Sequence, residues 1–287
     1  MSKQTFIFCL GATKAGTSWL FDYLYGHREC HFPAVKELHY FDALEGHDAA
    51  WLRKDAEARL ERARADVADA TDARPMAYQK QLVADLKRWL ATFDGQTRDD
   101  VAYLAYLRKG GSKARVIGDF TPAYGLLKEK TLAAMSGLTD KVRFVYLMRD
   151  PVERIWSNIR MVAGNEGQDA LQAKIDGVLA GTANNILDRS NYRRTLNRLS
   201  RAIPRDALHI EYYERLFTPD AIERLCAFLG ITPQPASFDR VVHQSAKADL
   251  PMGQRAQLQA ILKPQYNFVE KFMGELPSEW TQKMVSA

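Results

Sequence analysis

The most constraining feature of the sequence is a strand, a glycine loop and a helix in direct succession near the N-terminus. Residues 6–20 read Phe-Ile-Phe-Cys-Leu-Gly-Ala-Thr-Lys-Ala-Gly-Thr-Ser-Trp-Leu. The five apolar residues predict a buried strand, residues 11–16 a tight loop, and the residues from Thr17 onward a helix with its apolar side chains on one face. Because the N–H groups of such a loop and the positive end of the helix dipole converge on one point, this succession predicts a phosphate cradle.

The spacing within the loop distinguishes between kinds of phosphate ligand. A nucleotide-hydrolysing loop would read Gly-x4-Gly-Lys-Ser/Thr, whereas here Thr17 follows Gly16 directly and the lysine comes earlier, as Lys14. That departure argues against an ordinary ATPase. On this stretch alone, a modified ATP loop and a plain strand-to-helix turn with a solvent-exposed lysine both stay open.

The run from Lys14 to Leu20 resembles the 5′-phosphosulfate loop of the sulfotransferases, which use 3′-phosphoadenosine 5′-phosphosulfate (PAPS) as the sulfuryl donor. The resemblance implies that this loop binds PAPS and that Lys14 lies beside the oxygen bridging sulfur and phosphorus. It assigns donor contacts to six successive residues, Lys14, Ala15, Gly16, Thr17, Ser18 and Trp19.

A second stretch, residues 32–42, reads Phe-Pro-Ala-Val-Lys-Glu-Leu-His-Tyr-Phe-Asp. It resembles the Lys-Glu-x-His-Phe-Phe-Asp element of the sulfotransferases that modify heparan-type sugars and of their bacterial relatives, in which the glutamate takes the proton from the acceptor. A sugar hydroxyl is a poor nucleophile until a base removes that proton. Glu37 is therefore the first candidate for the base and His39 the second. The plain alternative is a solvated carboxylate beside a packed ring.

The third stretch, residues 142–159, predicts a buried strand that ends at Arg149 and a helix with Asp150 as its N-cap and Pro151 at its first position. The helical period of its apolar residues leaves Ser157 on the side away from the core. The stretch resembles the Arg-Asp-Pro-x-x-Arg-x-x-Ser element in which sulfotransferases bind the 3′-phosphate of PAPS. A guanidinium makes paired, charge-assisted bonds to a phosphate. The resemblance thus assigns the 3′-phosphate to Arg149 and Ser157; the alternative is that Arg149 is a surface cation at a strand end.

One segment departs from the family pattern. Residues 116–125 resemble the family's Glu-Lys-Thr/Ser-Pro-x-Tyr element, but Asp119 replaces the glutamate, and Phe120 stands where many heparan-type members carry a lysine near the transferred group. The charge of the leaving group is then left to Lys14, together with Lys36 or a cation that the sequence does not locate.

Strand and helix patterns alternate along the chain, which predicts an α/β, P-loop-like three-layer fold with a central, mainly parallel sheet flanked by helices. We expect a helical insertion at about residues 49–112, in which Pro75 ends the first helix and which walls the acceptor side of the cleft. Residues 163–185 predict a loop with one short helix. A late polar loop carries Lys247, for which a solvated lysine is favoured over a 3′-phosphate contact. We expect one sulfotransferase domain over residues 1–287.

Composition and charge narrow the class of partner. With 26% charged and 46% hydrophobic residues, the chain has the composition of an ordinary globular protein. Its formal charge of +5 suits an anionic ligand but is too small and too evenly spread to indicate nucleic acid. The sequence shows no signal-peptide pattern, and no apolar run approaches the ~20 residues that span a bilayer, so we expect a cytoplasmic protein without a transmembrane segment. Its cysteines lack metal-ligand spacing, and we expect no metal.

Together these features predict a sulfotransferase that moves a sulfuryl group from PAPS to a hydroxyl, or less readily an amine, of a carbohydrate or glycolipid-like acceptor. Two alternatives stay open. A P-loop kinase-like phosphoryl transferase would need Mg²⁺ ligands and a lysine directly before the Ser/Thr of the loop, and that lysine is absent. A catalytically silent nucleotide-binding protein would keep the fold, and Phe120 leaves room for it.

Overall fold

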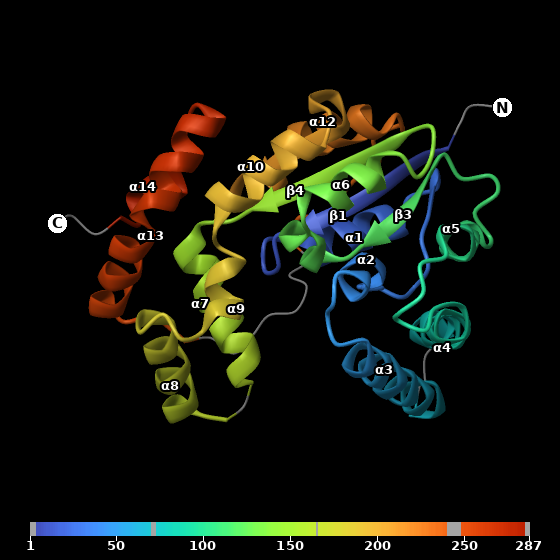
Figure 1. Cartoon of the computed structure of the whole chain (residues 1–287), viewed down its shortest axis with the longest axis horizontal. Helices are drawn as coiled ribbons and strands as arrows, with labels where there is room; N and C mark the ends of the chain where they lie inside the picture. The colour runs from blue at the N-terminus through green and yellow to red at the C-terminus, as the bar shows by residue number, and fades with distance from the viewer. Residues whose placement is uncertain (1–3, 70–72, 165, 240–247, 285–287) are drawn as a thin grey trace.

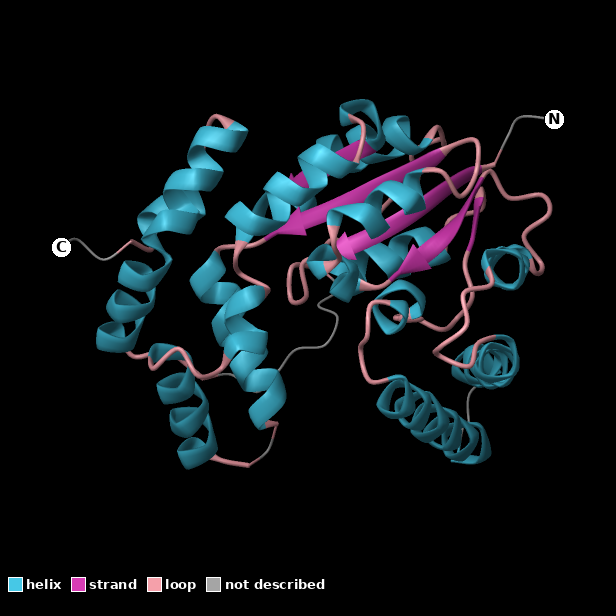
Figure 2. Cartoon of the chain, viewed as in Figure 1, coloured by secondary structure: helices cyan, strands magenta, loops and turns pink. Residues whose placement is uncertain are grey.

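The centre of the protein is a five-stranded parallel sheet. The computed structural model describes residues 4–69, 73–164, 166–239 and 248–284, with the backbone alone for residues 73–75. The strands lie in the order β2-β3-β1-β4-β5 (Figure 1, Figure 2). Their bounds are β1 (Thr5–Gly11), β2 (Cys30–His31), β3 (Val116–Phe120), β4 (Val142–Met148) and β5 (Leu208–Tyr212). The predicted α/β fold with helices around a parallel sheet is confirmed.

β1 and β4 form the middle of the core. All residues of β1 are buried, as are all residues of β4 except the half-buried Arg143. Phe8 of β1 is in register with Phe144 of β4, and the centres of their rings are 5.6 Å apart. Such uninterrupted apolar runs are typical of parallel strands that are covered on both faces.

The strand order determines which helices cover which face of the sheet. Four helices do so: α1 (Thr17–Tyr25), α6 (Glu129–Ser136), α10 (Tyr192–Ala202) and α12 (Pro219–Leu229). The chain runs outward from β1 through α1 to the edge strand β2, and in the opposite direction from β3 through α6 to β4. Because such crossovers are right-handed, α1 and α6 cover opposite faces. α10 contacts α6 and lies on the same face of the sheet as α6. α12 lies beside α1 on the other face, where Tyr23 Oη of α1 is 3.5 Å from Cys226 Sγ of α12.

The chain between β2 and β3 is helical over most of the expected region. It forms α2 (Tyr40–Leu44), α3 (Ala49–Asp69), α4 (Ala73–Thr92) and α5 (Asp100–Arg108). One detail of the prediction is wrong, because Pro75 does not end a helix but lies in the first turn of α4. A proline is tolerated there, since its missing N–H would have no partner within the helix. Asp99 caps α5 by accepting a hydrogen bond from the N–H of Ala102.

The remaining elements are the connections between strands and a group of helices that pack on one another beside the sheet (Figure 1). They are η1 (Pro122–Leu126), α7 (Pro151–Ala163), α8 (Gln168–Leu179), α9 (Asn184–Asp188), η2 (Arg205–Ala207), α11 (Tyr213–Leu216), α13 (Met252–Met273) and α14 (Ser278–Gln282). The expectation of a loop with one short helix over residues 163–185 is wrong. Ile175 and Val178 share one face of α8 and are buried, and α8 contacts α7. Burial of this apolar face stabilises a longer helix than the local pattern predicts.

The described segments contain neither a membrane-spanning helix nor a cluster of metal ligands. No helix in them is long and apolar enough to cross a membrane. Nor do their His, Cys, Asp and Glu side chains form a group of three or more that could hold a metal ion.

Candidate active site

The loop between β1 and α1 has the geometry of an anion cradle. Gly11 and Gly16 have φ of 126° and 88°, a region that favours glycine. A Cβ on Gly16 would lie 2.9 Å from the ring of Tyr213, and one on Gly11 would lie 2.7 Å from the carbonyl oxygen of Pro122. Gly16 is the N-cap of α1, and no side chain of the described residues caps that end. The first N–H groups of α1 are therefore available to an oxyanion.

The residues of this loop differ in which of their polar groups are already used in contacts within the protein. The N–H of Ala15 donates to the carbonyl oxygen of Ala12, so it is used within the loop. Thr17 is buried at the first position of α1. The hydroxyl of Ser18 accepts a hydrogen bond of 2.7 Å from Nζ of Lys36, which brings a second lysine to the start of the helix.

Trp19 supports the loop with a buried side chain. Its indole N–H donates to the carbonyl oxygen of Ser237 at 3.0 Å, and its ring is stacked against Tyr23 and Phe238. The side chain is only 6% exposed. What Trp19 offers to an anion is its backbone N–H, in the first turn of α1.

Positive charges gather at the loop. The pKa of Lys14 lies below its ordinary value because burial disfavours the ammonium group and because Arg149, Arg160 and Lys36 repel it, while Glu37 partly offsets these effects. Burial also lowers the pKa of Lys36. Cations that are held close enough to oppose one another's charge are typical of a site that binds an anion.

Arg149 directly follows β4 and is held at the loop. Its N–H donates to Tyr192 Oη at 3.2 Å, and Tyr192 Oη in turn donates to its carbonyl oxygen at 2.6 Å. Its guanidinium carbon lies 4.6 Å from the centre of the Tyr213 ring, and its Nη1 donates to the carbonyl oxygen of Lys14 at 3.3 Å. The structure therefore brings the two motifs that were expected to bind phosphates to the same edge of the sheet.

The start of α7 agrees with the sequence, and its second turn is buried on both sides. Asp150 is the N-cap, and its carboxylate accepts hydrogen bonds from the N–H groups of Val152 and Glu153. Ser157 is only 6% exposed, so the side of α7 away from the apolar stripe is covered as well. The reason is that α8, α9 and α13 all contact α7, which leaves it little solvent-facing surface. Lys247 lies outside the described residues.

Glu37 and His39 lie between β2 and α2, on a segment bonded to the end of β3. The N–H of Glu37 donates to the carbonyl oxygen of Phe120 at 2.9 Å, and the N–H of Leu38 donates to the hydroxyl of Thr121 at 3.0 Å. Glu37 and His39 have φ of 60° and 56°. A left-handed backbone at residues other than glycine is uncommon and is concentrated at functional sites, where the surrounding structure holds the strain.

The two candidate bases have different partners. His39 Nδ1 lies 2.6 Å from Asp42 Oδ2, and His39 Nε2 lies 3.8 Å from Glu37 Oε2. Burial lowers the pKa of His39, but the hydrogen bond and charge of Asp42, with help from Glu37 and Asp119, raise it above its ordinary value. The side chain of Glu37 is 43% exposed, against 21% for His39. His39 is thus held between two carboxylates, and Glu37 has the more open position.

The β3 residues behind Glu37 are structural. Phe120 packs in the core, with its ring centre 5.3 Å from those of Phe21 and Phe32. The carboxylate of Asp119 accepts hydrogen bonds of 2.8 Å from three buried hydroxyls, those of Tyr103, Thr121 and Tyr124. Burial raises the pKa of Asp119 to about 6, although these hydroxyls oppose the shift. Asp119 therefore ties α5 and η1 to the strand, and neither β3 residue brings a cation to the loop.

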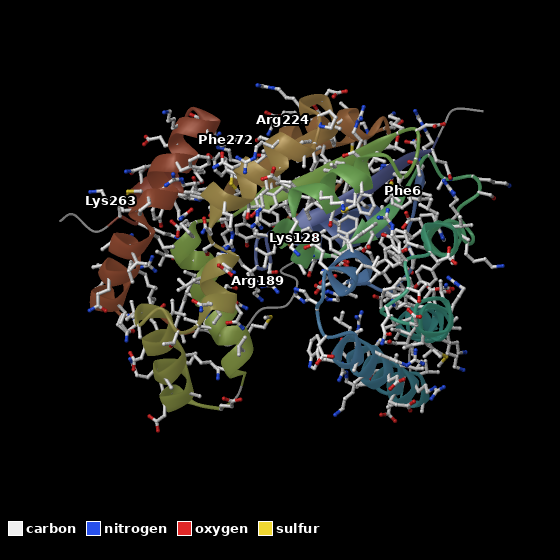
Figure 3. The ribbon with its side chains drawn as sticks, viewed as in Figure 1. Phe6, Lys128, Arg189, Arg224, Lys263 and Phe272 are labelled. Carbon is white, nitrogen blue, oxygen red and sulfur yellow. The ribbon has the colours of Figure 1, made fainter. Side chains whose placement is uncertain are left out.

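Arg189 brings the cation that the sequence did not locate. It directly follows α9, and its Nη1 donates to Thr13 Oγ1 at 2.7 Å. Burial lowers the pKa of Arg189 below its ordinary value, although the charges of Glu37 and Asp42 oppose the shift. Figure 3 shows Arg189 beside the C-terminal ends of the central strands. The two residues are 176 positions apart in sequence, so no local motif could have indicated this contact.

A narrow crevice of about 30 Å³ runs from the Glu37 segment to the helices α3 and α4. Its walls include Glu37, His39, Arg59, Trp89 and Phe93. Arg59 also donates to the carbonyl oxygen of Lys36 at 2.7 Å, so α3 is bonded to the segment that carries the candidate base.

Comparisons with known proteins assign the family. Among solved structures, the chain is similar to a sulfotransferase from Alicyclobacillus acidocaldarius, with a TM-score of 0.63 and 18% identity over 97% of this chain and 99% of that one. It is also similar to the sulfotransferase domain of the Synechococcus PCC 7002 olefin synthase, with a TM-score of 0.53 and 20% identity over 96% and 98% of the two chains. No curated protein sequence matches significantly. The model of the Sulfotransferase family matches residues 7–235, and the chain belongs to that family.

Proposed function

We propose that this sulfotransferase moves a sulfuryl group from PAPS to a hydroxyl, or less readily an amine, of a carbohydrate or glycolipid-like acceptor. The observation that carries the proposal is the gathering of Lys14, Lys36 and Arg149 around the uncapped start of α1, with Glu37 close enough to shift the pKa values of both lysines. PAPS presents a phosphosulfate and a separate 3′-phosphate, and this distribution of cations suits both groups.

Donor binding is divided between two elements in this proposal. The N–H groups at the start of α1, from Thr17 to Trp19, hold the 5′-phosphosulfate together with Lys14. Arg149 and Ser157 hold the 3′-phosphate, because a guanidinium fork and a hydroxyl both donate to phosphate oxygens. Fixing the donor at its two ends orients the sulfur for attack, which supplies a large part of the rate.

The transfer step needs one base and several positive charges. The acceptor oxygen forms a bond to sulfur as the bond between sulfur and the bridging oxygen breaks, and the acceptor proton passes to Glu37. Negative charge develops on the leaving phosphate, where Lys14 and the helix start stabilise it. His39, held by Asp42, orients the Glu37 carboxylate.

Arg189 supplies the positive charge that many heparan-type members supply with a lysine at the position of Phe120. Its contact with Thr13 places a guanidinium on the side of the loop that faces Glu37, where it stabilises charge on the oxygens of the transferred group. Arg189→Ala should lower kcat roughly 10- to 100-fold and leave the affinity for 3′,5′-adenosine bisphosphate unchanged. Arg189→Lys, which keeps the charge, should recover part of that loss in the same steady-state assay.

Thr13→Val is the matched control for Arg189, because it removes the hydroxyl that accepts the hydrogen bond but keeps the guanidinium. Its kcat should stay near that of the wild type. If Thr13→Val loses as much activity as Arg189→Ala, Arg189 holds the loop in place and is not a source of charge for the reaction.

A second prediction concerns the 3′-phosphate. Arg149→Ala should weaken binding of 3′,5′-adenosine bisphosphate by roughly 1.5–3 kcal/mol, or about 10- to 150-fold, because a phosphate loses a charge-assisted pair. AMP, which lacks the 3′-phosphate, should bind the variant and the wild type nearly equally. Titration calorimetry with both nucleotides makes the comparison, and equal losses for the two would remove Arg149 from the 3′-phosphate site.

The activity itself is tested by mass spectrometry. A cell extract is incubated with the protein and PAPS, and an acceptor should gain the mass of one sulfuryl group. Repeating the incubation with ATP and Mg²⁺ tests phosphoryl transfer, for which a gain of one phosphoryl group would replace the proposal. PAPS binding without turnover on an acceptor panel would favour a silent nucleotide-binding protein.

A further inference from the structure

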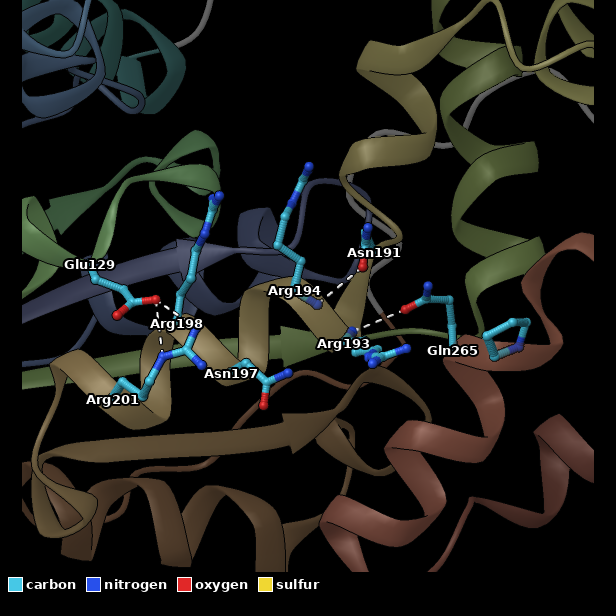
Figure 4. Close-up of a pocket in the computed structure, with 9 residues that line it drawn as sticks. Glu129, Asn191, Arg193, Arg194, Asn197, Arg198, Arg201 and Gln265 are labelled. Atoms are coloured by element: carbon cyan, nitrogen blue, oxygen red, sulfur yellow. Dashed lines mark hydrogen bonds and ion pairs between the residues drawn. The ribbon is translucent and has the colours of Figure 1, made fainter.

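The fold gathers positive charge in a second place, along α10. A hollow of about 560 Å³ lies on this helix between α6 and α13 (Figure 4). We name it the arginine groove, after the residues that dominate its lining, Arg193, Arg194, Arg198 and Arg201, with the amides of Asn197 and Gln265. The sequence alone suggested that the charge is evenly spread, but the helical period brings these arginines to one surface.

The groove keeps an excess of positive charge after its internal pairs are counted. Arg201 Nη2 lies 2.6 Å from Glu129 Oε1, and Arg194 Nη2 lies 2.8 Å from Asp188 Oδ1. Arg198 donates to a backbone carbonyl, which carries no net charge, and Arg193 is exposed. Within the described part of the chain, two of the four guanidinium groups thus form ion pairs with carboxylates and two do not.

Two amide side chains in the lining, those of Asn191 and Gln265, are oriented as donors. Asn191 accepts from the N–H of Arg194 through its Oδ1, and Gln265 accepts from the N–H of Arg193 through its Oε1. Their amide oxygens are therefore occupied, and their NH₂ groups remain for a ligand (Figure 4). A surface of guanidinium and NH₂ donors is complementary to sulfate, phosphate or carboxylate oxygens.

The lining also indicates which kind of anion fits. Among the described residues, the lining has no aromatic side chain on which a nucleic-acid base could stack. Pro264 is the one apolar residue in this described lining, which therefore lacks the apolar face of a membrane-binding helix. A ligand with many oxygens and no need for stacking or insertion suits it. Anionic saccharides have this chemistry.

The groove begins next to the active site. One residue separates Arg189, which contacts the loop at Thr13, from Asn191 in the lining, so their Cα atoms are at most about 7.6 Å apart. About two turns further along α10, Arg198 donates to the carbonyl oxygen of Leu126, at the end of η1. In Figure 4, Arg194 and Arg198 extend from α10 toward the same side.

We propose that the arginine groove binds the anionic portion of the acceptor, a saccharide that carries sulfate, phosphate or carboxylate groups away from the hydroxyl to be sulfated. The inference rests on the proposed function for its description of the ligand as an acceptor. Binding of an anionic saccharide to the groove can be measured without turnover, so the two ideas fail separately.

The test is a binding titration with sucrose octasulfate as the probe and uncharged sucrose as its counterpart. 3′,5′-Adenosine bisphosphate is present at saturation, so that the probe does not occupy the donor site. The test variant is Arg193→Glu, which reverses one charge in the groove while leaving the paired arginines in place. Its control is Arg108→Glu, the same charge reversal at an exposed position of α5.

We expect the wild type to bind the octasulfate and not sucrose, the groove variant to bind it roughly tenfold or more weakly, and the control to bind like the wild type. Circular dichroism and bisphosphate affinity show that each variant is folded. Equal losses in the groove variant and the control would overturn the proposal, as would an octasulfate affinity that the groove variant leaves unchanged.

Two further arms test other partners. An oligodeoxythymidylate or an anionic phospholipid vesicle that competes with the octasulfate, and binds more tightly through the same residues, would replace the saccharide with nucleic acid or a membrane. The protein could bind the octasulfate through the groove and yet transfer no sulfuryl group to any acceptor. That result would support the anion-binding site and contradict the proposed function.

Discussion

Glu37→Gln should lower kcat by about 10²–10⁴-fold, because the amide keeps the shape of the side chain but cannot accept the proton of the acceptor. Affinity for 3′,5′-adenosine bisphosphate should be nearly intact, since the carboxylate is proposed to act on the acceptor and not on the donor. The measurement is steady-state turnover on the acceptor that mass spectrometry identifies, together with calorimetry on the bisphosphate. Near-normal turnover would remove Glu37 as the base, and a loss confined to donor affinity would assign it to holding the loop.

His39→Gln is the matched control, and pH separates the two candidates. The pKa of His39 is raised above its ordinary value, because the hydrogen bond and charge of Asp42 outweigh the effect of burial. Below that pKa the imidazole is protonated and cannot act as a base, so an imidazole mechanism would lose activity as pH falls through it. With Glu37 as the base, kcat should persist below the pKa of His39, and His39→Gln should retain measurable turnover with no new loss on the acidic side.

The local parts of the site could be predicted from the sequence because each is encoded within a short stretch. Gly16 before Thr17 marks the turn from strand to helix, and Asp150 before Pro151 marks the start of α7. The order of strand, loop and helix at both places follows from apolar periodicity and caps. That both motifs lie at one sheet edge follows from parallel pairing, since β1 and β4 are neighbours and point the same way.

What the sequence could not reveal depends on contacts between distant segments. Arg189 reaches Thr13 only because α7, α8 and α9 pack together and return the chain to the loop. Ser157 is buried for a similar reason, because helices from later in the sequence cover α7. The local pattern of residues 163–185 is polar and rich in glycine, which predicts a loop. Burial of Ile175 stabilises helix α8 there instead. Tertiary packing determines these three features, and the periodicity of the sequence does not indicate which distant segments pack together.

Lys14 comes earlier in the loop than the lysine of an ATP-binding loop does. Its replacement should have a large effect on kcat. Lys14 has φ of 70°, so the backbone turns sharply at this residue. Its Nζ lies 3.6 Å from Met161 Sδ, a weak partner that leaves the ammonium group available to a ligand. In the proposed reaction it stabilises charge on the oxygen that leaves sulfur.

Lys14→Met should therefore lower kcat by about 10²–10³-fold, the effect of removing one donor to a developing oxyanion, with a smaller loss in bisphosphate affinity. Lys14→Gly is the control for the backbone, because glycine adopts this φ without strain. A loss in Lys14→Gly as large as in Lys14→Met shows that the ammonium group is what matters. If Lys14→Gly keeps most of the activity, the ammonium has no role in the reaction.

Lys14→Arg supplies the test by pH. Burial and the neighbouring cations lower the pKa of Lys14, so in the free enzyme the ammonium group is lost at a lower pH than in an exposed lysine. The kcat/KM of the wild type should consequently fall as pH rises through that lowered pKa, since the neutral amine no longer stabilises the leaving group. Arginine stays protonated across this range, so Lys14→Arg should move the fall to higher pH even where its turnover is reduced. An alkaline limb that stays in place in Lys14→Arg would mean that another group titrates, and would remove Lys14 as the source of the charge.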